Sequence, residues 1–212
     1  MNESSEAAVL RRSSAGIVLA GGRSTRFGSD KLAAAHDGRP LVHLAISAVA
    51  AVCGEVVVVT SSAGAPPLPT GLPVSLRLCR DAVPDRGPLG GLIAGLRETM
   101  APTVVVVGGD MPGLVPAVLA LLLDRLRTGV DAVTLADGER VRPLPSALAR
   151  DAALAVAEAM TDGRPGIRDL LSGLRTEQVP AAEWRRLDPA GSSLFDVDRP
   201  GDLARLARTA PG

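Results

Sequence analysis

The chain has 212 residues, of which 46% are hydrophobic, and this is enough for one well-buried core and predicts one domain. Its formal net charge is zero and it has few aromatic residues, Phe27, Trp184 and Phe195. These features argue against a basic surface for nucleic acid and against base-stacking platforms for single strands.

Residues 1–14 are polar, contain Glu3 and Glu6, and lack the apolar segment of a signal peptide. We therefore expect a disordered tail at 1–14, followed by a single domain over 15–208. Because no apolar run approaches the roughly 20 residues that span a bilayer, no membrane contact is expected. Cys53 and Cys79 lack the spacing of metal ligands, which indicates free thiols and a cytoplasmic protein.

From residue 16 onward, short runs rich in β-branched residues alternate with segments of helical periodicity. Runs without polar alternation indicate strands covered on both faces, and their alternation with helices indicates parallel crossovers in a doubly wound sheet. Strands are predicted at 16–20, 55–60, 74–78 and 103–107, and helices at 40–52, 88–100 and 116–127.

The later part of the chain has a different pattern. Residues 130–136 and 139–148 flank Asp137-Gly138, a dipeptide typical of a type I′ hairpin turn, so we expect an antiparallel ribbon late in a parallel sheet. Further helices are predicted at 151–160, 166–174 and 200–208, and the proline-rich segment 62–73 is expected to be a surface loop.

Lys31 is the only lysine of the chain, and it ends the glycine-rich segment 19–31. Its compact ammonium group differs from a planar guanidinium, so a narrow phosphate site can require it. Glycines without Cβ atoms let backbone N–H groups approach a polyphosphate closely. A triphosphate site is therefore favoured over a tight turn, although the spacing fits neither G-x-x-x-x-G-K nor G-x-G-x-x-G. The glycines are Gly21, Gly22 and Gly28, and the arginines that add charge are Arg23 and Arg26.

Carboxylates follow the carboxyl ends of the predicted strands, where open parallel sheets bind ligands. Asp81 follows the third strand, and Asp110 follows the fourth. Asp110 is well placed to hold Mg²⁺, but an aspartate there can equally cap a helix. Asp196 and Asp198 are two residues apart and point the same way in an extended segment, so both can contribute to a metal's oxygen shell. Alternatively, Asp198 caps the expected last helix.

Residues 19–31, Leu-Ala-Gly-Gly-Arg-Ser-Thr-Arg-Phe-Gly-Ser-Asp-Lys, resemble the signature of the MobA-type nucleotidyltransferases, the molybdenum cofactor guanylyltransferases. The resemblance covers nearly the whole chain after the tail. Further similar segments are the Gly-Pro-Leu-x-Gly loop at 87–92, the metal-binding turn at 109–112, the hairpin at 137–140 with Pro143, the cofactor-side helix at 163–171 with Arg168, and the C-terminal segment at 195–203.

The resemblance implies a three-layer α/β/α mononucleotide-binding, Rossmann-like fold with a mostly parallel sheet. It also implies transfer of GMP from GTP to the terminal phosphate of Mo-molybdopterin, with release of pyrophosphate and with Mg²⁺ as cofactor. The implied partners are GTP and a molybdopterin-type acceptor, and we expect a monomer that contacts molybdoenzyme-maturation proteins transiently. Catalytic roles fall to Lys31, Arg26 and Asp110, nucleotide binding to Leu19, Ala20, Gly21, Gly22, Lys31, Asp81, Gly87, Pro88, Leu89 and Asp110, and metal binding to Asp110 and Asp198.

The chain departs from the family pattern at several positions. Phe27 replaces a methionine, and Val59-Thr60-Ser61 stands where the family has an asparagine. Asp196-Val197-Asp198 replaces Asn-x-Asn and resembles cytidylyl-transferring relatives, whereas Gly21-Gly22 favours the guanylyl branch. Three alternatives therefore stay open: a cytidylyltransferase for the same cofactor, a guanylyltransferase for a small phosphorylated acid, and a non-catalytic nucleotide-binding relative.

Overall fold

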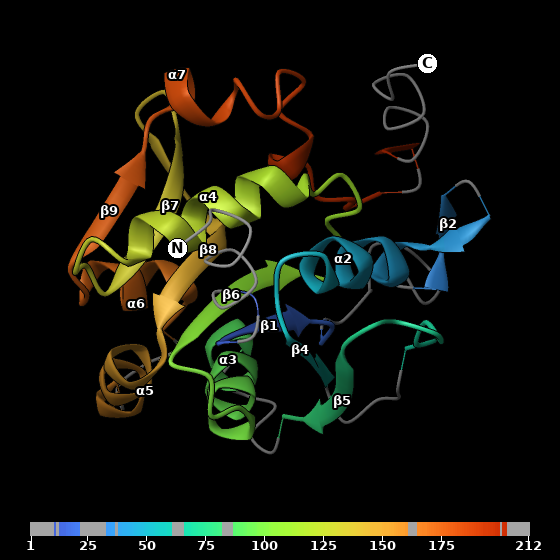
Figure 1. Cartoon of the computed structure of the whole chain (residues 1–212), viewed down its shortest axis with the longest axis horizontal. Coiled ribbons are helices and arrows are strands. Elements are labelled where there is room, and N and C mark those ends of the chain that lie inside the picture. The colour runs from blue at the N-terminus through green and yellow to red at the C-terminus, as the bar shows by residue number, and fades with distance from the viewer. Residues whose placement is uncertain are drawn as a thin grey trace, which may run out of the picture.

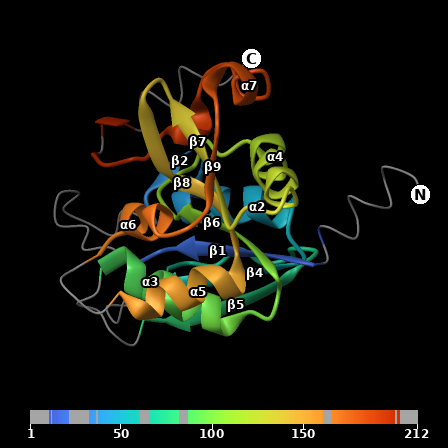
Figure 2. The ribbon, with the colours of Figure 1, turned by 90° about the vertical axis from the view of Figure 1, so that its left-hand side faces the viewer.

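A computed structural model of the chain describes residues 11, 13–21, 33–36, 38–60, 66–81, 87–160, 165–199 and 201–202. Within these residues, seven strands form one mostly parallel sheet with helices on both of its faces (Figures 1 and 2). The expected three-layer α/β/α architecture is thus confirmed. No helix among the described residues is both long and apolar enough to cross a membrane.

The sheet has the strand order β5-β4-β1-β6-β8-β7-β9. Neighbours among β5, β4, β1 and β6 pair in parallel, as do β7 and β9, whereas β8 runs antiparallel to both β6 and β7. The carboxyl ends of the first four strands therefore share one edge of the sheet. The strands are β1 Ser14–Leu19, β4 Glu55–Thr60, β5 Ser75–Arg80, β6 Thr103–Gly108, β7 Ala132–Asp137, β8 Arg140–Ala149 and β9 Thr176–Val179.

The valine runs of the central strands supply both faces of the core. Along β4, Val56 and Val58 face a cluster with helices α2 and α4, and Val57 and Val59 face a cluster with α3, α5 and α6. Because successive side chains of a strand point to opposite faces, an unbroken valine run fits a strand covered on both sides. The helices are α2 Leu41–Ala50, α3 Gly87–Glu98, α4 Pro116–Leu126, α5 Arg150–Ala159 and α6 Ile167–Ser172 (Figure 2).

The hairpin predicted around Asp137-Gly138 is present as β7 and β8, but its turn is shifted by one residue. Asp137 still pairs with Arg140, so the turn residues are Gly138, whose φ is 62°, and Glu139. Farther along, Thr134 pairs with Ser146 while the next residue, Leu135, pairs with Arg142. Residues 143–145 therefore stand outside the pairing, and the two prolines among them could not have donated a backbone hydrogen bond.

One predicted strand is not covered on both faces as we expected. The strand β5 lies at an edge of the sheet, and its side chains are mostly exposed or half-buried, because Arg77 and Arg80 interrupt its apolar residues. Short elements were not predicted: β9, a hairpin of β2 (Ala35–His36) and β3 (Arg39–Pro40), helix α7 (Ala181–Trp184) and the 3₁₀ helix η3 (Ser192–Leu194).

The first described residues lie at the end of the segment for which we expected a disordered tail. Strand β1 begins at Ser14, whose hydroxyl is hydrogen-bonded to that of Thr103. Arg11 donates to the carbonyl oxygens of Ala50 and Cys53 at 2.9 and 3.4 Å. Residues 1–10 and 12 lie outside the described part of the chain, as does 203–208 of the expected last helix.

Candidate functional site

Backbone hydrogen bonds join the carboxyl ends of the parallel strands into one edge. The N–H of Gly109 donates to Leu19 O at 3.0 Å, and that of Ala20 donates to Val59 O at 2.7 Å. Asp81 is held at the end of β5 by a 2.8 Å bond from its N–H to Thr60 O. The polar residues that follow these strands are therefore brought together at the carboxyl edge, which is where open parallel sheets bind ligands.

The predicted phosphate loop is described only at its beginning. Leu19 is half-buried against the α3 side of the core, Ala20 is buried, and Gly21 is exposed. The predicted site residues Gly22, Arg26 and Lys31 lie outside the described residues, so their roles stay predictions.

The N-terminal half of α3 lies next to this loop and Asp81. A Cβ atom added at Gly91 would lie 3.7 Å from Leu19 Cδ2 and 4.0 Å from Asp81 Oδ2, so these three residues meet at one place. Gly87 and Pro88 are exposed at the helix start, whereas the side chain of Leu89 is fully buried in the core. Leu89 can thus face a nucleotide only through its backbone N–H, which a helix N-terminus offers to anions.

Asp110 lies in a turn after β6, and its carboxylate folds back over Gly108. A Cβ atom on Gly108 would come within 2.4 Å of Asp110 Oδ1, so the missing side chain gives the carboxylate its place. Helix α4 begins only at Pro116, with Val115 at its N-cap position. The alternative of a cap of α4 for Asp110 is therefore wrong, and Asp110 lies at the carboxyl edge of the sheet.

A C-terminal segment brings a second acidic group to Asp110. The N–H of Val197 donates to Asp110 O at 2.9 Å, and the Val197 side chain is fully buried while those of Asp196 and Asp198 are exposed. This alternation fits the expectation that the two aspartates point the same way. Partial burial raises the pKa of Asp196, and the charges of Asp198 and Asp110 raise it further, whereas Arg142 lowers it. Asp196 thus lies within the electrostatic range of both Asp198 and Asp110.

These carboxylates fit a magnesium site that the substrate completes. Among the described residues, no three His, Cys, Asp or Glu side chains converge closely enough to hold a metal ion by themselves. Mg²⁺ is usually held by one or two carboxylates together with substrate phosphates and water, so it needs no such cage. Asp110 and Asp198 remain the predicted ligands, and Asp196 stands beside them.

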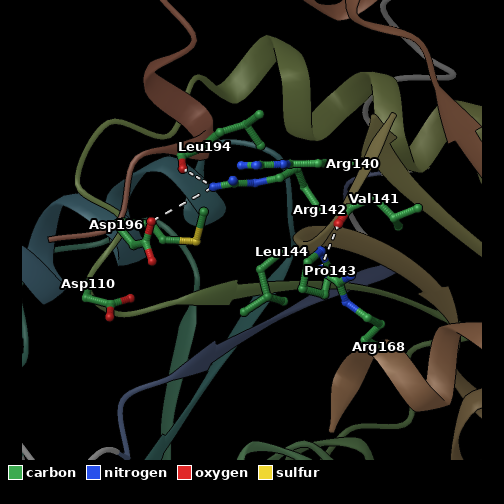
Figure 3. A pocket seen from close by; sticks show the side chains of 10 residues that line it. Asp110, Arg140, Val141, Arg142, Pro143, Leu144, Arg168, Leu194 and Asp196 are labelled. Carbon is green, nitrogen blue, oxygen red and sulfur yellow. Dashed lines mark hydrogen bonds and ion pairs between the residues drawn. The ribbon is translucent and has the colours of Figure 1, made fainter. Parts of the chain in front are cut away.

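A pocket of about 620 Å³ opens beside Asp110 and Asp196 (Figure 3). Its walls come from the turn after β6, from β8, from α6 and from the C-terminal segment. Three cationic and two anionic side chains face it together with apolar ones, which suits a small ligand that carries an anionic group. The lining residues are Asp110, Met111, Arg140, Val141, Arg142, Pro143, Leu144, Arg168, Leu194 and Asp196.

The three arginines of the pocket differ in how they are held. Arg142 donates to Leu194 O at 2.8 Å and lies 4.0 Å from the Asp196 carboxylate, and Arg168 donates to Val141 O at 3.2 Å. Figure 3 shows Arg140 and Arg142 extending side by side from β8. No hydrogen bond or ion pair of the Arg140 guanidinium to another described residue is present, so it is available to an anionic ligand.

The sequence did not single out Arg140 or Arg142 as site residues. Residues two apart on a strand share a face, so the Arg-x-Arg spacing was a usable signal once the hairpin was predicted. Which face meets the pocket depends on the pairing of β8 with both of its neighbours. The family resemblance placed Arg168 in the cofactor-side helix, and Arg168 does line the pocket.

Residues 16–179 match the family described as the MobA-like NTP transferase domain. A probable molybdenum cofactor guanylyltransferase from Chloroflexus aggregans is 33% identical over 195 residues, which cover 89% of this chain and 90% of that protein. Another from Natronomonas pharaonis is 35% identical, with 90% and 95% covered. The crystal structure of molybdopterin-guanine dinucleotide biosynthesis protein A from Archaeoglobus fulgidus has the same fold, with a TM-score of 0.72 at 24% identity over 90% of this chain and 95% of that one.

Proposed function

This chain belongs to the MobA-like NTP transferase domain family and is a nucleotidyltransferase, and we propose that it transfers GMP from GTP to the terminal phosphate of Mo-molybdopterin. The observation that carries the proposal is the meeting of two acidic segments, at Asp110 and at 196–198, beside an arginine-lined pocket. Both lie at the sheet edge where the predicted phosphate loop begins. One side of the acidic group can thus take the triphosphate, and the other side can take an anionic acceptor.

On the nucleotide side, Gly21 and the start of α3 offer backbone N–H groups to phosphate oxygens. Lys31 and Arg26 add positive charge to the triphosphate, and Asp81 accepts hydrogen bonds from the nucleoside. Phosphoryl transfer requires positioning and charge stabilisation more than a covalent nucleophile on the protein. An oxygen of the acceptor phosphate attacks the α-phosphorus, the bond from that phosphorus to the bridging oxygen breaks, and pyrophosphate leaves with the bonding electrons.

The carboxylates of Asp110 and Asp198 would hold Mg²⁺. When bound, the ion neutralises the negative charge that phosphate oxygens carry in the transition state. The chain's own contribution is to bring together the two segments that carry these carboxylates. The turn after β6 fixes Asp110, and the hydrogen bond from Val197 N to Asp110 O fixes the segment that carries Asp198.

On the acceptor side, the pocket volume of about 620 Å³ lies within the range of small-molecule sites, roughly 300–1,000 Å³. We assign the acceptor phosphate to Arg140, whose guanidinium has no partner among the described residues, with Arg168 of α6 as a second cation that lines the pocket. Arg142 holds the C-terminal segment through Leu194 O. We further propose that the protein acts as a monomer and that it acts in the cytoplasm; its free cysteines support the second of these.

A cytidylyltransferase is the second candidate, because Asp196-Val197-Asp198 stands where guanylyltransferases of the family have asparagines. We favour GTP because Gly21 and Gly22 leave room for a purine and expose backbone groups to its edge. A site that satisfies both guanine O6 and its exocyclic amine leaves buried groups unpaired with cytosine, at about 1–3 kcal/mol each. GTP should therefore be favoured by roughly tenfold to several hundredfold.

The test is to incubate the protein with GTP, CTP or ATP, Mg²⁺ and either Mo-molybdopterin or a small phosphorylated acid, and to measure pyrophosphate. We expect fast pyrophosphate release only when GTP is combined with Mo-molybdopterin. Faster release with CTP would favour the cytidylyl candidate, and faster release with the small acid would reassign the acceptor. No release with any pair, despite tight GTP binding, would support a non-catalytic relative.

A further inference from the structure

Asp188 is a buried carboxylate that the proposed reaction does not use. It is 3% exposed, and its two oxygens accept the backbone N–H groups of Ser192 at 3.0 Å and Ser193 at 2.7 Å. Its own N–H donates to Trp184 O, and its carbonyl accepts Gly191 N–H at 3.0 Å. Gly191 has a φ of 71°, which favours glycine and lets the chain fold back toward Asp188. The carboxylate therefore organises the turn that ends in η3.

This turn packs on the loop that carries Asp110. The Ser193 hydroxyl oxygen, fully buried, accepts the N–H of Val115 at 3.0 Å. A Cβ atom on Gly113 would lie 2.6 Å from Ser192 O, so the two backbones touch there only because residue 113 is glycine. Two contacts thus join 188–193 to the Asp110 loop. They come earlier in the chain than the hydrogen bond from Val197 N to Asp110 O, which joins the same two segments.

We propose that Asp188 and Ser193 are positioning residues of the transferase reaction. Together with Ser192 and Val115 they form a clasp that sets the distance between the Asp110 loop and the segment carrying Asp196 and Asp198. The proposal rests on the proposed function in so far as those carboxylates serve phosphoryl transfer. Neither Asp188 nor Ser193 lines the pocket, so each acts on the site through the backbone.

The chemistry of the clasp requires a carboxylate. Two adjacent N–H groups point at one side chain, and a carboxylate gives each of them a charged acceptor oxygen. Asparagine would accept only one bond and would turn its NH₂ toward the other N–H. Asp188→Asn therefore keeps the size of the side chain and breaks one half of the clasp, leaving a buried donor without its acceptor.

The first test is amide hydrogen exchange of Asp188→Asn, resolved by residue with NMR. If the clasp couples the two segments, exchange accelerates at Ser192 and Ser193 and also at Val115 and Val197, which Asp188 does not touch. A purely local role would accelerate exchange at Ser192 and Ser193 only, and that pattern would overturn the proposal. This readout requires neither nucleotide nor acceptor.

The second test is the Mg²⁺ dependence of turnover in the same variant. Groups that orient ligand carboxylates typically change metal affinity or activity by about 10- to 100-fold when mutated. We expect the Mg²⁺ concentration for half-maximal rate to rise about tenfold, with little change in KM for GTP, because the contacts of the clasp lead to Val115 and Gly113 on the Asp110 loop. An unchanged Mg²⁺ dependence would contradict a positioning role.

Two further variants keep the proposal testable if Asp188→Asn folds poorly. Ser193→Ala removes the acceptor for Val115 N–H, and Gly113→Ala forces the two backbones apart without altering either clasp residue. Both should reproduce the raised Mg²⁺ requirement. Glu55→Gln is the matched control, because Glu55 also holds two partners, Thr99 and Arg77, but at the start of β4 on the opposite edge. It should lower stability and leave the Mg²⁺ requirement unchanged.

The outcomes separate the two proposals. A wild-type protein that transfers no nucleotide refutes the proposed function, while coupled exchange at Val115 and Val197 in Asp188→Asn would still establish the clasp. A wild type that transfers GMP, with variants that show wild-type Mg²⁺ dependence and only local exchange, refutes the clasp and leaves the function intact.

Discussion

Replacing Gly108 by alanine displaces the Asp110 carboxylate without removing it. The added Cβ would lie 2.4 Å from Asp110 Oδ1 and 3.3 Å from Met111 Cγ, whereas ordinary contacts begin near 3.4 Å. The carboxylate oxygen must therefore retreat by about 1 Å. A displacement of about 1 Å at a reacting site can cost on the order of 100-fold in rate, and overpacking costs about 1–3 kcal/mol of stability. We expect Gly108→Ala to fold, with kcat about 100-fold below that of the wild type.

The assay is the initial rate of pyrophosphate release at saturating GTP and Mg²⁺, together with thermal unfolding. Asp110→Asn should itself abolish most Mg²⁺-dependent turnover with little loss of stability, since this residue caps no helix. In that background Gly108→Ala should lower the rate little further, because both changes act on the same carboxylate. Gly173→Ala, where a Cβ would lie 2.9 Å from Val156 Cγ1 of α5, is the control, because it overpacks the protein without contacting a carboxylate. Wild-type turnover in Gly108→Ala, or full additivity with Asp110→Asn, would refute the reasoning.

Lys31→Arg should abolish most turnover and leave the melting temperature unchanged, because the broader guanidinium misplaces the triphosphate; a near wild-type rate would sink this expectation. Arg140→Gln should raise the acceptor KM by about 10- to 100-fold at constant GTP KM, by loss of a charged hydrogen bond, whereas Arg186→Gln on the exposed surface should not. Burial raises the pKa of Cys53 to about 12, so the unfolded chain loses this proton first as pH rises above about 8.5. Stability to urea should then fall by about 1–2 kcal/mol between pH 8 and pH 10, and Cys53→Ala should remove most of that fall; equal falls in both proteins would exclude the thiol as the cause.

The central strands were predictable because their valine runs fit few other environments. The pattern of β5 misled because its apolar residues alternate with arginines, as an edge strand allows and a central strand does not. The four-residue strand β9 carries too short a pattern to be distinguished from a loop, and it exists because β7 offers it a partner.

For the site, the positions of Asp81 and Asp110 in the sequence were enough to predict that both lie at one edge of the sheet, because the carboxyl ends of parallel strands meet there. It could not decide between metal ligand and helix cap for Asp110, since that depended on where α4 begins. It also could not assign Arg140, whose direction depends on strand pairing, or Asp188, which belongs to no motif and matters through two backbone N–H groups.

The central claim is that the α-phosphate of GTP passes to the acceptor. The most direct measurement uses GTP labelled on the α-phosphate in one reaction and on the γ-phosphate in another, each with Mg²⁺ and Mo-molybdopterin. The account predicts that the α label appears in the acceptor and that the γ label appears only in pyrophosphate. Release of the γ label as inorganic phosphate, or an acceptor without the α label, would contradict nucleotidyl transfer.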